Sequence, residues 1–88
     1  MALFLIERNF AEKLEVSKES ADAIKLINRE VGVNWLFSFL SADKKKTYCL
    51  YEGPSAEAMR EAARRANIPA DVVIEVSEIN PELISPSA

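Results

Sequence analysis

Histidine is absent from this 88-residue sequence, which removes the commonest metal ligand and the usual acid–base group at neutral pH. Cys49 is the only cysteine, so the chain forms no internal disulfide and has no all-cysteine metal site. The apolar start meets Glu7 and Arg8 too early for a signal peptide, and no run has the roughly twenty apolar residues of a membrane helix. These absences predict a cytoplasmic protein that does not enter a membrane.

A basic surface is also missing. The net charge is −3 and the pI is about 5.0, so nothing in the composition indicates binding to nucleic acid. Recognition of RNA on a sheet of this kind would also need stacked aromatic residues on two central strands in basic surroundings, and the chain lacks this arrangement. With 49% hydrophobic and 28% charged residues, the sequence predicts one globular domain over residues 1–80, followed by a C-terminal tail over 81–88.

Strand and helix signals alternate along the chain. Period-two or short apolar runs predict strands over residues 2–9, 33–41, 47–52 and 72–79. Ser17 is a suitable N-cap for a helix that ends before Gly32, and Ser55 caps a second helix that runs through Asn67. The order βαββαβ predicts a ferredoxin-like α+β fold, a four-stranded antiparallel sheet with both helices on one face.

The predicted sheet is apolar on both faces. On the second strand the alternation places Val33, Trp35, Phe37 and Phe39 on one face, and Leu36 and Leu40 with Asn34 and Ser38 on the other. The first and fourth strands also have apolar side chains on both faces. Two helices cover only one face, so we expect a homodimer that pairs the helix-free faces as a dimeric α/β barrel.

Two carboxylates are candidates for a site inside such a barrel. Glu7 on the first strand and Glu75 on the fourth lie on neighbouring strands and could share a face. Such a pair could hold a hard cation or polarise a substrate. Alternatively, both lie near strand ends in solvent or pair with arginines.

Three further side chains offer polar groups to a ligand: Ser38, Cys49 and Tyr51. Tyr48 and Tyr51 point to opposite faces of the third strand, so one of them faces the helices. A buried free thiol such as Cys49 usually packs as a small hydrophobic group. Without histidine, Cys49 cannot form a Cys–His nucleophile.

Several stretches together resemble a known family. They are Phe4–Arg8, the spacing of Trp35 with Ser38–Phe39, Asp43–Lys44 before Tyr48–Tyr51, the run Pro54–Ala66, and Ile68–Asp71. Their order and spacing are similar to the small ferredoxin-like family described as nickel-binding proteins, otherwise a domain of unknown function. The resemblance implies a dimeric ferredoxin-like fold and raises nickel as a candidate cofactor, while the sequence itself leaves the cofactor unknown. Family members often carry histidine where this chain has Phe37 and Ala62, so nickel here would rely on carboxylate, thiolate and backbone ligands.

Three functions follow as hypotheses. The first is a non-enzymatic homodimer that binds a small ligand or metal between its sheets, using Glu7, Ser38, Cys49, Tyr51 and Glu75. The second is a cofactor-free enzyme of the dimeric α/β barrel type, similar to monooxygenases or isomerases, for which only Glu7, Glu75, a tyrosine or Cys49 could supply an acid–base group. The third is a partner-binding module whose helix-free face meets a different protein.

Overall fold

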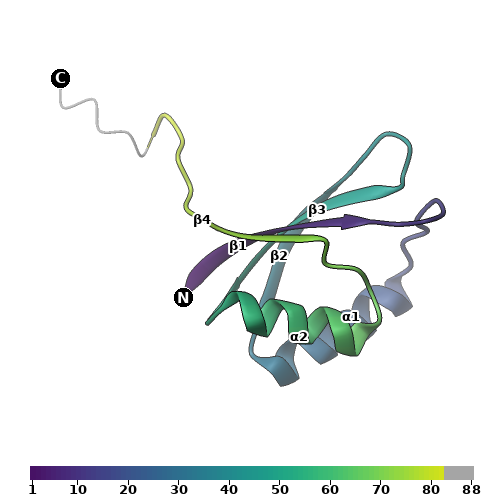
Figure 1. Ribbon diagram of the computed structural model, residues 1–88, viewed down its shortest axis with the longest axis horizontal. Coiled ribbons are helices and arrows are strands. Elements are labelled where there is room, and N and C mark those ends of the chain that lie inside the picture. Colours follow the sequence, from purple (N-terminus) through teal and green to yellow (C-terminus); the bar gives the residue numbers. More distant parts are fainter. Residues whose placement is uncertain (83–88) are drawn as a thin grey trace.

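The structure is a computed structural model that describes residues 1–82. Its elements are β1 (Ala2–Asn9), α1 (Lys18–Val31), β2 (Asn34–Leu40), β3 (Lys46–Gly53), α2 (Ala56–Ala66) and β4 (Val72–Val76). The strands form one antiparallel sheet in the order β2-β3-β1-β4. Both helices lie on one side of this sheet (Figure 1). The ferredoxin-like fold predicted from the sequence is therefore confirmed.

Both helices begin after their predicted N-caps and α1 ends before Gly32 as predicted, whereas α2 ends at Ala66, one residue before its predicted end. The Ser17 hydroxyl accepts a hydrogen bond from the Ser20 backbone N–H, and the Ser55 hydroxyl accepts one from that of Ala58. The C-cap of α1 is Gly32, whose φ of 89° is readily adopted only by glycine. The C-cap of α2 is Asn67, which also takes the left-handed conformation.

The core lies between the helices and one face of the sheet. Phe4 and Ile6 of β1 and Tyr51 of β3 are buried there against Met59 and Ala62 of α2. The alanines of α2 allow the helix to approach the sheet closely, as its small inner face predicts. We call this covered side the helix face of the sheet and the opposite side its open face.

Strand β2 departs from the predicted alternation. Trp35 pairs with Tyr51, whereas Phe37 already pairs with Leu50, so a β-bulge adds one residue between Trp35 and Phe37. Because a bulge shifts every later side chain to the other face, Trp35 lies on the helix face while Phe37 and Phe39 lie on the open face. The predicted grouping of Val33, Trp35, Phe37 and Phe39 on one face is wrong for this reason.

The C-terminal strand is shorter than predicted. Strand β4 ends at Val76 rather than at residue 79, and Ile79 is exposed beyond it. Residues 81 and 82 form a turn, and the rest of the predicted tail, 83–88, lies outside the described residues.

The open face carries large exposed apolar side chains. Phe39 is 65% exposed, and Phe37 and Ile74 are each 50% exposed. Leu36, Tyr48 and Val72 add to the exposed apolar residues of the same sheet. No helix among residues 1–82 is long and apolar enough to cross a membrane.

Candidate functional site

A cavity of about 300 Å³ lies on the helix face, at the end of the sheet where β1 finishes and β3 begins. Side chains of β1, β2 and β3 form its floor, and the first turns of α1 and the connector between β1 and α1 form its walls. The lining is mostly apolar: Phe10, Leu14, Val16, Ala21, Ile24, Trp35, Leu40 and Ile68, with Arg8, Glu15, Ser20, Ser38, Thr47, Cys49 and Tyr51 as the other members. A partly closed apolar space with few polar groups is typical of a small-molecule site.

The connector wall is held in place by the backbone. The Phe10 N–H donates to the Lys45 carbonyl and the Leu14 N–H donates to the Lys44 carbonyl, each at 2.7 Å. These bonds tie the connector to the loop between β2 and β3. The wall of the cavity is therefore anchored at Phe10 and Leu14, although residues 10–16 form no helix or strand.

Arg8 is the one cationic side chain that lines this cavity, and it is only 3% exposed. Its Nη1 donates to the Pro69 carbonyl at 2.6 Å and its Nη2 donates to the Tyr51 hydroxyl at 3.5 Å. Both acceptors are neutral. Among residues 1–82, no carboxylate forms an ion pair with Arg8.

Tyr51 contacts both the Arg8 guanidinium and the Trp35 ring. The Arg8 guanidinium lies 5.7 Å from the Tyr51 ring centroid, and the Trp35 ring stacks on Tyr51 at 6.4 Å with an angle of 9° between the planes. The Asn28 amide also donates to the Tyr51 hydroxyl, at 3.5 Å. Burial raises the pKa of Tyr51 above its usual value, outweighing the opposite effect of the Arg8 charge, so the phenol is neutral at physiological pH.

Ser38 and Cys49 lie in the same cavity as Tyr51. The Ser38 Oγ accepts a 2.8 Å hydrogen bond from the Trp35 indole, which fixes that ring against the cavity. The Cys49 thiol is buried and lies 3.6 Å from the Thr47 hydroxyl. Three of the five predicted site residues therefore meet in one place, beneath the helices rather than between two sheets.

Glu7 and Glu75 do not join them. Glu7 on β1 lies opposite Tyr48 of β3 and Val72 of β4, and its side chain is on the open face. Glu75 on β4 lies opposite Phe4 of β1, and its side chain is on the helix face. The prediction that the two carboxylates share a face is wrong, because Glu7 and Phe4 are an odd number of residues apart on β1. Neither carboxylate lines the cavity.

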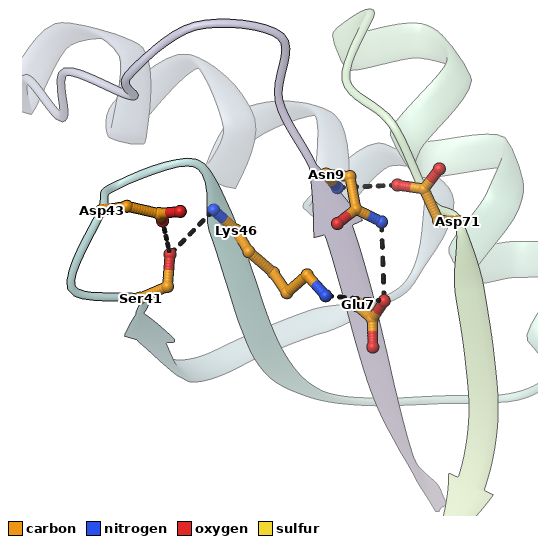
Figure 2. A network of polar contacts seen from close by, with 6 residues as sticks. All are labelled: Glu7, Asn9, Ser41, Asp43, Lys46 and Asp71. Atoms are coloured by element: carbon orange, nitrogen blue, oxygen red, sulfur yellow. Dashed lines mark hydrogen bonds and ion pairs between the residues drawn. The ribbon is translucent and has the colours of Figure 1, made fainter.

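Glu7 instead belongs to a surface network (Figure 2). Its carboxylate lies 3.5 Å from the Lys46 ammonium and accepts a 3.5 Å hydrogen bond from the Asn9 amide. The Asn9 backbone N–H donates to Asp71 at 2.7 Å, which ties the end of β1 to the start of β4. The attraction of Glu7 raises the pKa of Lys46. These contacts make Glu7 an ion-pair partner of Lys46, and not of the arginines expected as its alternative partners.

Sequence reasoning overlooked Arg8 and Trp35 as site residues. The signal for Arg8 was present, because it lies two and four residues after the buried Ile6 and Phe4 and so shares their face. The connector residues carried no periodic signal, and only the folded chain brings Leu14 and Val16 to the cavity.

Metal-binding groups are sparse. No group of three or more His, Cys, Asp or Glu side chains within residues 1–82 is placed to hold a metal ion. The only carboxylate in the cavity lining is Glu15, which is exposed. The chemistry of this site is therefore that of an apolar pocket with one buried cation.

Comparisons with known proteins agree with this fold. The crystal structure of SCO4226 from Streptomyces coelicolor A3(2) superposes with a TM-score of 0.78 at 25% sequence identity, covering 90% of this chain and all of that one. No curated protein matches the sequence significantly. The family described as nickel responsive protein SCO4226-like matches residues 4–76, most of the chain. The chain therefore belongs to the SCO4226-like family of nickel-responsive proteins.

Proposed function

We propose that this protein is a non-enzymatic, ligand-binding homodimer in which each chain takes a small organic molecule into its helix-face cavity. The observation that carries the proposal is the 300 Å³ apolar cavity with buried Arg8 in its wall. A space of this size lies at the lower end of small-molecule sites. Burial raises the pKa of Tyr51, which keeps the phenol neutral at physiological pH, and neither Glu7 nor Glu75 lines the cavity; both facts support binding rather than catalysis.

Filling the cavity tests the binding function. Ala21 on the first turns of α1 lines the cavity and Ala23 on the same helix is exposed away from it, so Ala21→Phe and Ala23→Phe form a matched pair. We expect Ala21→Phe to abolish the binding of small amphiphiles measured by calorimetry, and Ala23→Phe to leave it unchanged. Equal binding by both variants would show that the ligand lies elsewhere.

The homodimer is proposed to form through the open face. Phe37, Phe39 and Ile74 expose too much apolar surface there for a chain that remains monomeric. A second copy of the same face would cover these residues around a two-fold axis.

A charge on the open face tests the dimer. We expect Phe39→Asp to give a folded monomer in sedimentation velocity, because Phe39 is 65% exposed in the single chain and contributes little to its core. Leu26→Asp is the control, since Leu26 is 56% exposed on α1, away from the sheet. A dimer that survives Phe39→Asp would rule out the open face as its interface.

Nickel does not fit the residues that this chain provides. Nickel sites in proteins rely on imidazole or thiolate ligands, and the chain has no histidine and one buried cysteine. Although the family is named for its response to nickel, we propose that this member binds an organic ligand instead. The free buried thiol of Cys49 is consistent with a reducing compartment, and we propose a cytoplasmic location on that ground.

A further inference from the structure

We propose that the helix-face cavity selects small organic carboxylates, whose anionic group pairs with the buried guanidinium of Arg8 while the apolar part occupies the rest of the space. This inference rests on the proposed ligand-binding function and specifies the chemical class of the ligand.

The argument begins with an unbalanced charge. A guanidinium stays protonated in proteins, and burying a charge is costly unless an opposite charge or several hydrogen bonds compensate it. Arg8 is 3% exposed, and its two hydrogen-bond acceptors, the Pro69 carbonyl and the Tyr51 hydroxyl, are neutral. The fold therefore desolvates this cation without supplying a counter-charge among residues 1–82.

Neighbouring acidic groups do not supply that charge. Asp71 accepts a hydrogen bond from the Asn9 backbone, and Glu7 lies on the open face with Lys46. Glu15 lines the cavity but is exposed and forms no ion pair with Arg8. Tyr51 cannot serve as an anion at neutral pH, because burial raises its pKa.

Arg8 retains donors for a ligand. A guanidinium has five N–H donors, and two nitrogens of Arg8 make the bonds to Pro69 and Tyr51. The planar fork of an arginine matches the two oxygens of a carboxylate. A phosphate monoester carries more negative charge than one cation balances, and Arg8 is the only cationic residue in the lining.

The remaining lining fits an apolar ligand body. Leu14, Ile24 and Leu40 line the cavity together with the rings of Trp35 and Tyr51. Arg8 is the cationic member of the same lining, and Ser20, Ser38 and Thr47 are its other small polar members. A monocarboxylate with a short alkyl chain or one aromatic ring has a charged group that can pair with Arg8 and an apolar body that can contact the rest of the lining.

Matched pairs of ligands test the inference on the untagged full-length protein. The pairs are octanoate with octanamide and benzoate with benzamide, which differ in charge but little in shape. Trp35 is the only tryptophan and lines the cavity, so its fluorescence reports binding, and calorimetry gives the dissociation constants. We expect at least one carboxylate to bind tenfold or more tightly than its amide.

Arg8→Met keeps much of the side-chain length and removes the charge. We expect it to abolish the preference for the carboxylate while the amide still binds, and Arg60→Met, at an exposed position outside the lining, to leave the preference intact. If Arg8→Met fails to fold, the ratio measured on the unaltered protein decides the question alone. Glu15→Gln should leave thermal stability unchanged and keep or increase carboxylate affinity; a large loss of stability would identify Glu15 as the counter-ion of Arg8 and overturn the inference.

The outcomes separate this inference from the proposed function. Equal affinity for both members of each pair would leave the ligand-binding function standing and overturn carboxylate selection. Tighter binding of octyl phosphate than of octanoate would also overturn it, in favour of phosphate. Absence of binding by every amphiphile would overturn the ligand-binding function and this inference together.

Discussion

The guanidinium of Arg8 lies over the ring of Tyr51, 5.7 Å from its centroid, and donates to the Tyr51 hydroxyl at 3.5 Å. The tyrosine therefore meets the cation through its π-face and its oxygen, and both contacts are with a neutral group. This arrangement holds Arg8 beneath the helices without cancelling its charge. Arg8, near the end of its strand, is thereby buried and still belongs to the lining of the cavity.

The first prediction concerns the ionisation of Tyr51. Its pKa lies above the ordinary value of 10.0, mainly because burial disfavours the phenolate. The absorbance at 295 nm, measured as the difference between the protein and its Tyr51→Phe variant, should show a transition centred above pH 10. A transition centred below pH 10 would contradict the burial of this hydroxyl.

The free energy of unfolding should also depend on the ionisation of Tyr51. The folded chain keeps the Tyr51 proton to a higher pH than the unfolded chain, so the stabilisation is complete below about pH 10 and is lost as pH rises through the folded pKa. Urea unfolding between pH 9 and 11.5 should show a smaller fall for Tyr51→Phe than for the unaltered protein. Lys46, whose pKa is also raised, contributes in the same direction to both proteins, so the difference isolates Tyr51.

The second prediction concerns Gly53 at the end of β3. A Cβ at this position would lie 2.5 Å from Met59 Cε and 3.0 Å from Val33 Cγ1, and both side chains are buried. Overpacking of this kind should make Gly53→Ala less stable by about 1–3 kcal/mol in urea unfolding. A stability equal to that of the unaltered protein would mean that the Met59 methyl and Val33 move aside without cost.

Gly32→Ala is the control for Gly53. A Cβ at Gly32 meets nothing within 4 Å, so its cost of about 1–2 kcal/mol should come from the left-handed backbone alone. Shortening the clashing side chain with Met59→Leu should recover part of the loss in Gly53→Ala and none of it in Gly32→Ala.

The third prediction concerns metal. Native mass spectrometry of the untagged protein after addition of nickel, zinc or cobalt should show no stoichiometric metal, because residues 1–82 contain no group of three potential ligands. A polyhistidine tag would supply the imidazoles that the chain lacks and must be absent. Retention of one nickel per chain would contradict this expectation, and its loss in Cys49→Ser would identify the thiolate as a ligand.

The fourth prediction separates the two strand carboxylates from the cavity. Glu7→Gln and Glu75→Gln should leave the affinity for an amphiphilic ligand within threefold of the original value, because neither residue lines the cavity. Calorimetry with octanoate measures this. A larger loss of affinity for either variant would show that its carboxylate takes part in ligand binding.

Local signals predicted much of the fold. Ser17 and Ser55 cap their helices as expected, and the run from Ala2 to Asn9 is a strand with both predicted ends. Capping and alternation act between residues a few positions apart, so they can be read from the order of residues. The exposed aromatic residues of the open face were expected for the same reason, although the assignment of individual side chains on β2 was not correct.

The site required the tertiary structure. The bulge between Trp35 and Phe37 depends on how β2 pairs with β3, and it decides that Trp35 and Ser38 share a face with Cys49 and Tyr51. The connector that lines the cavity is hydrogen-bonded to the loop between β2 and β3, through the pairs Phe10–Lys45 and Leu14–Lys44, which lie far apart in the chain.

The sequence by itself determined the order of the elements, their caps and the lack of imidazole ligands, because these depend on residue identity and on neighbours along the chain. The tertiary structure decided which side chains meet. It moved the candidate site from the open face to the space beneath the helices and gave Arg8 its place there. The physical reason is that strand register and desolvation arise from contacts between distant segments, which no local pattern specifies.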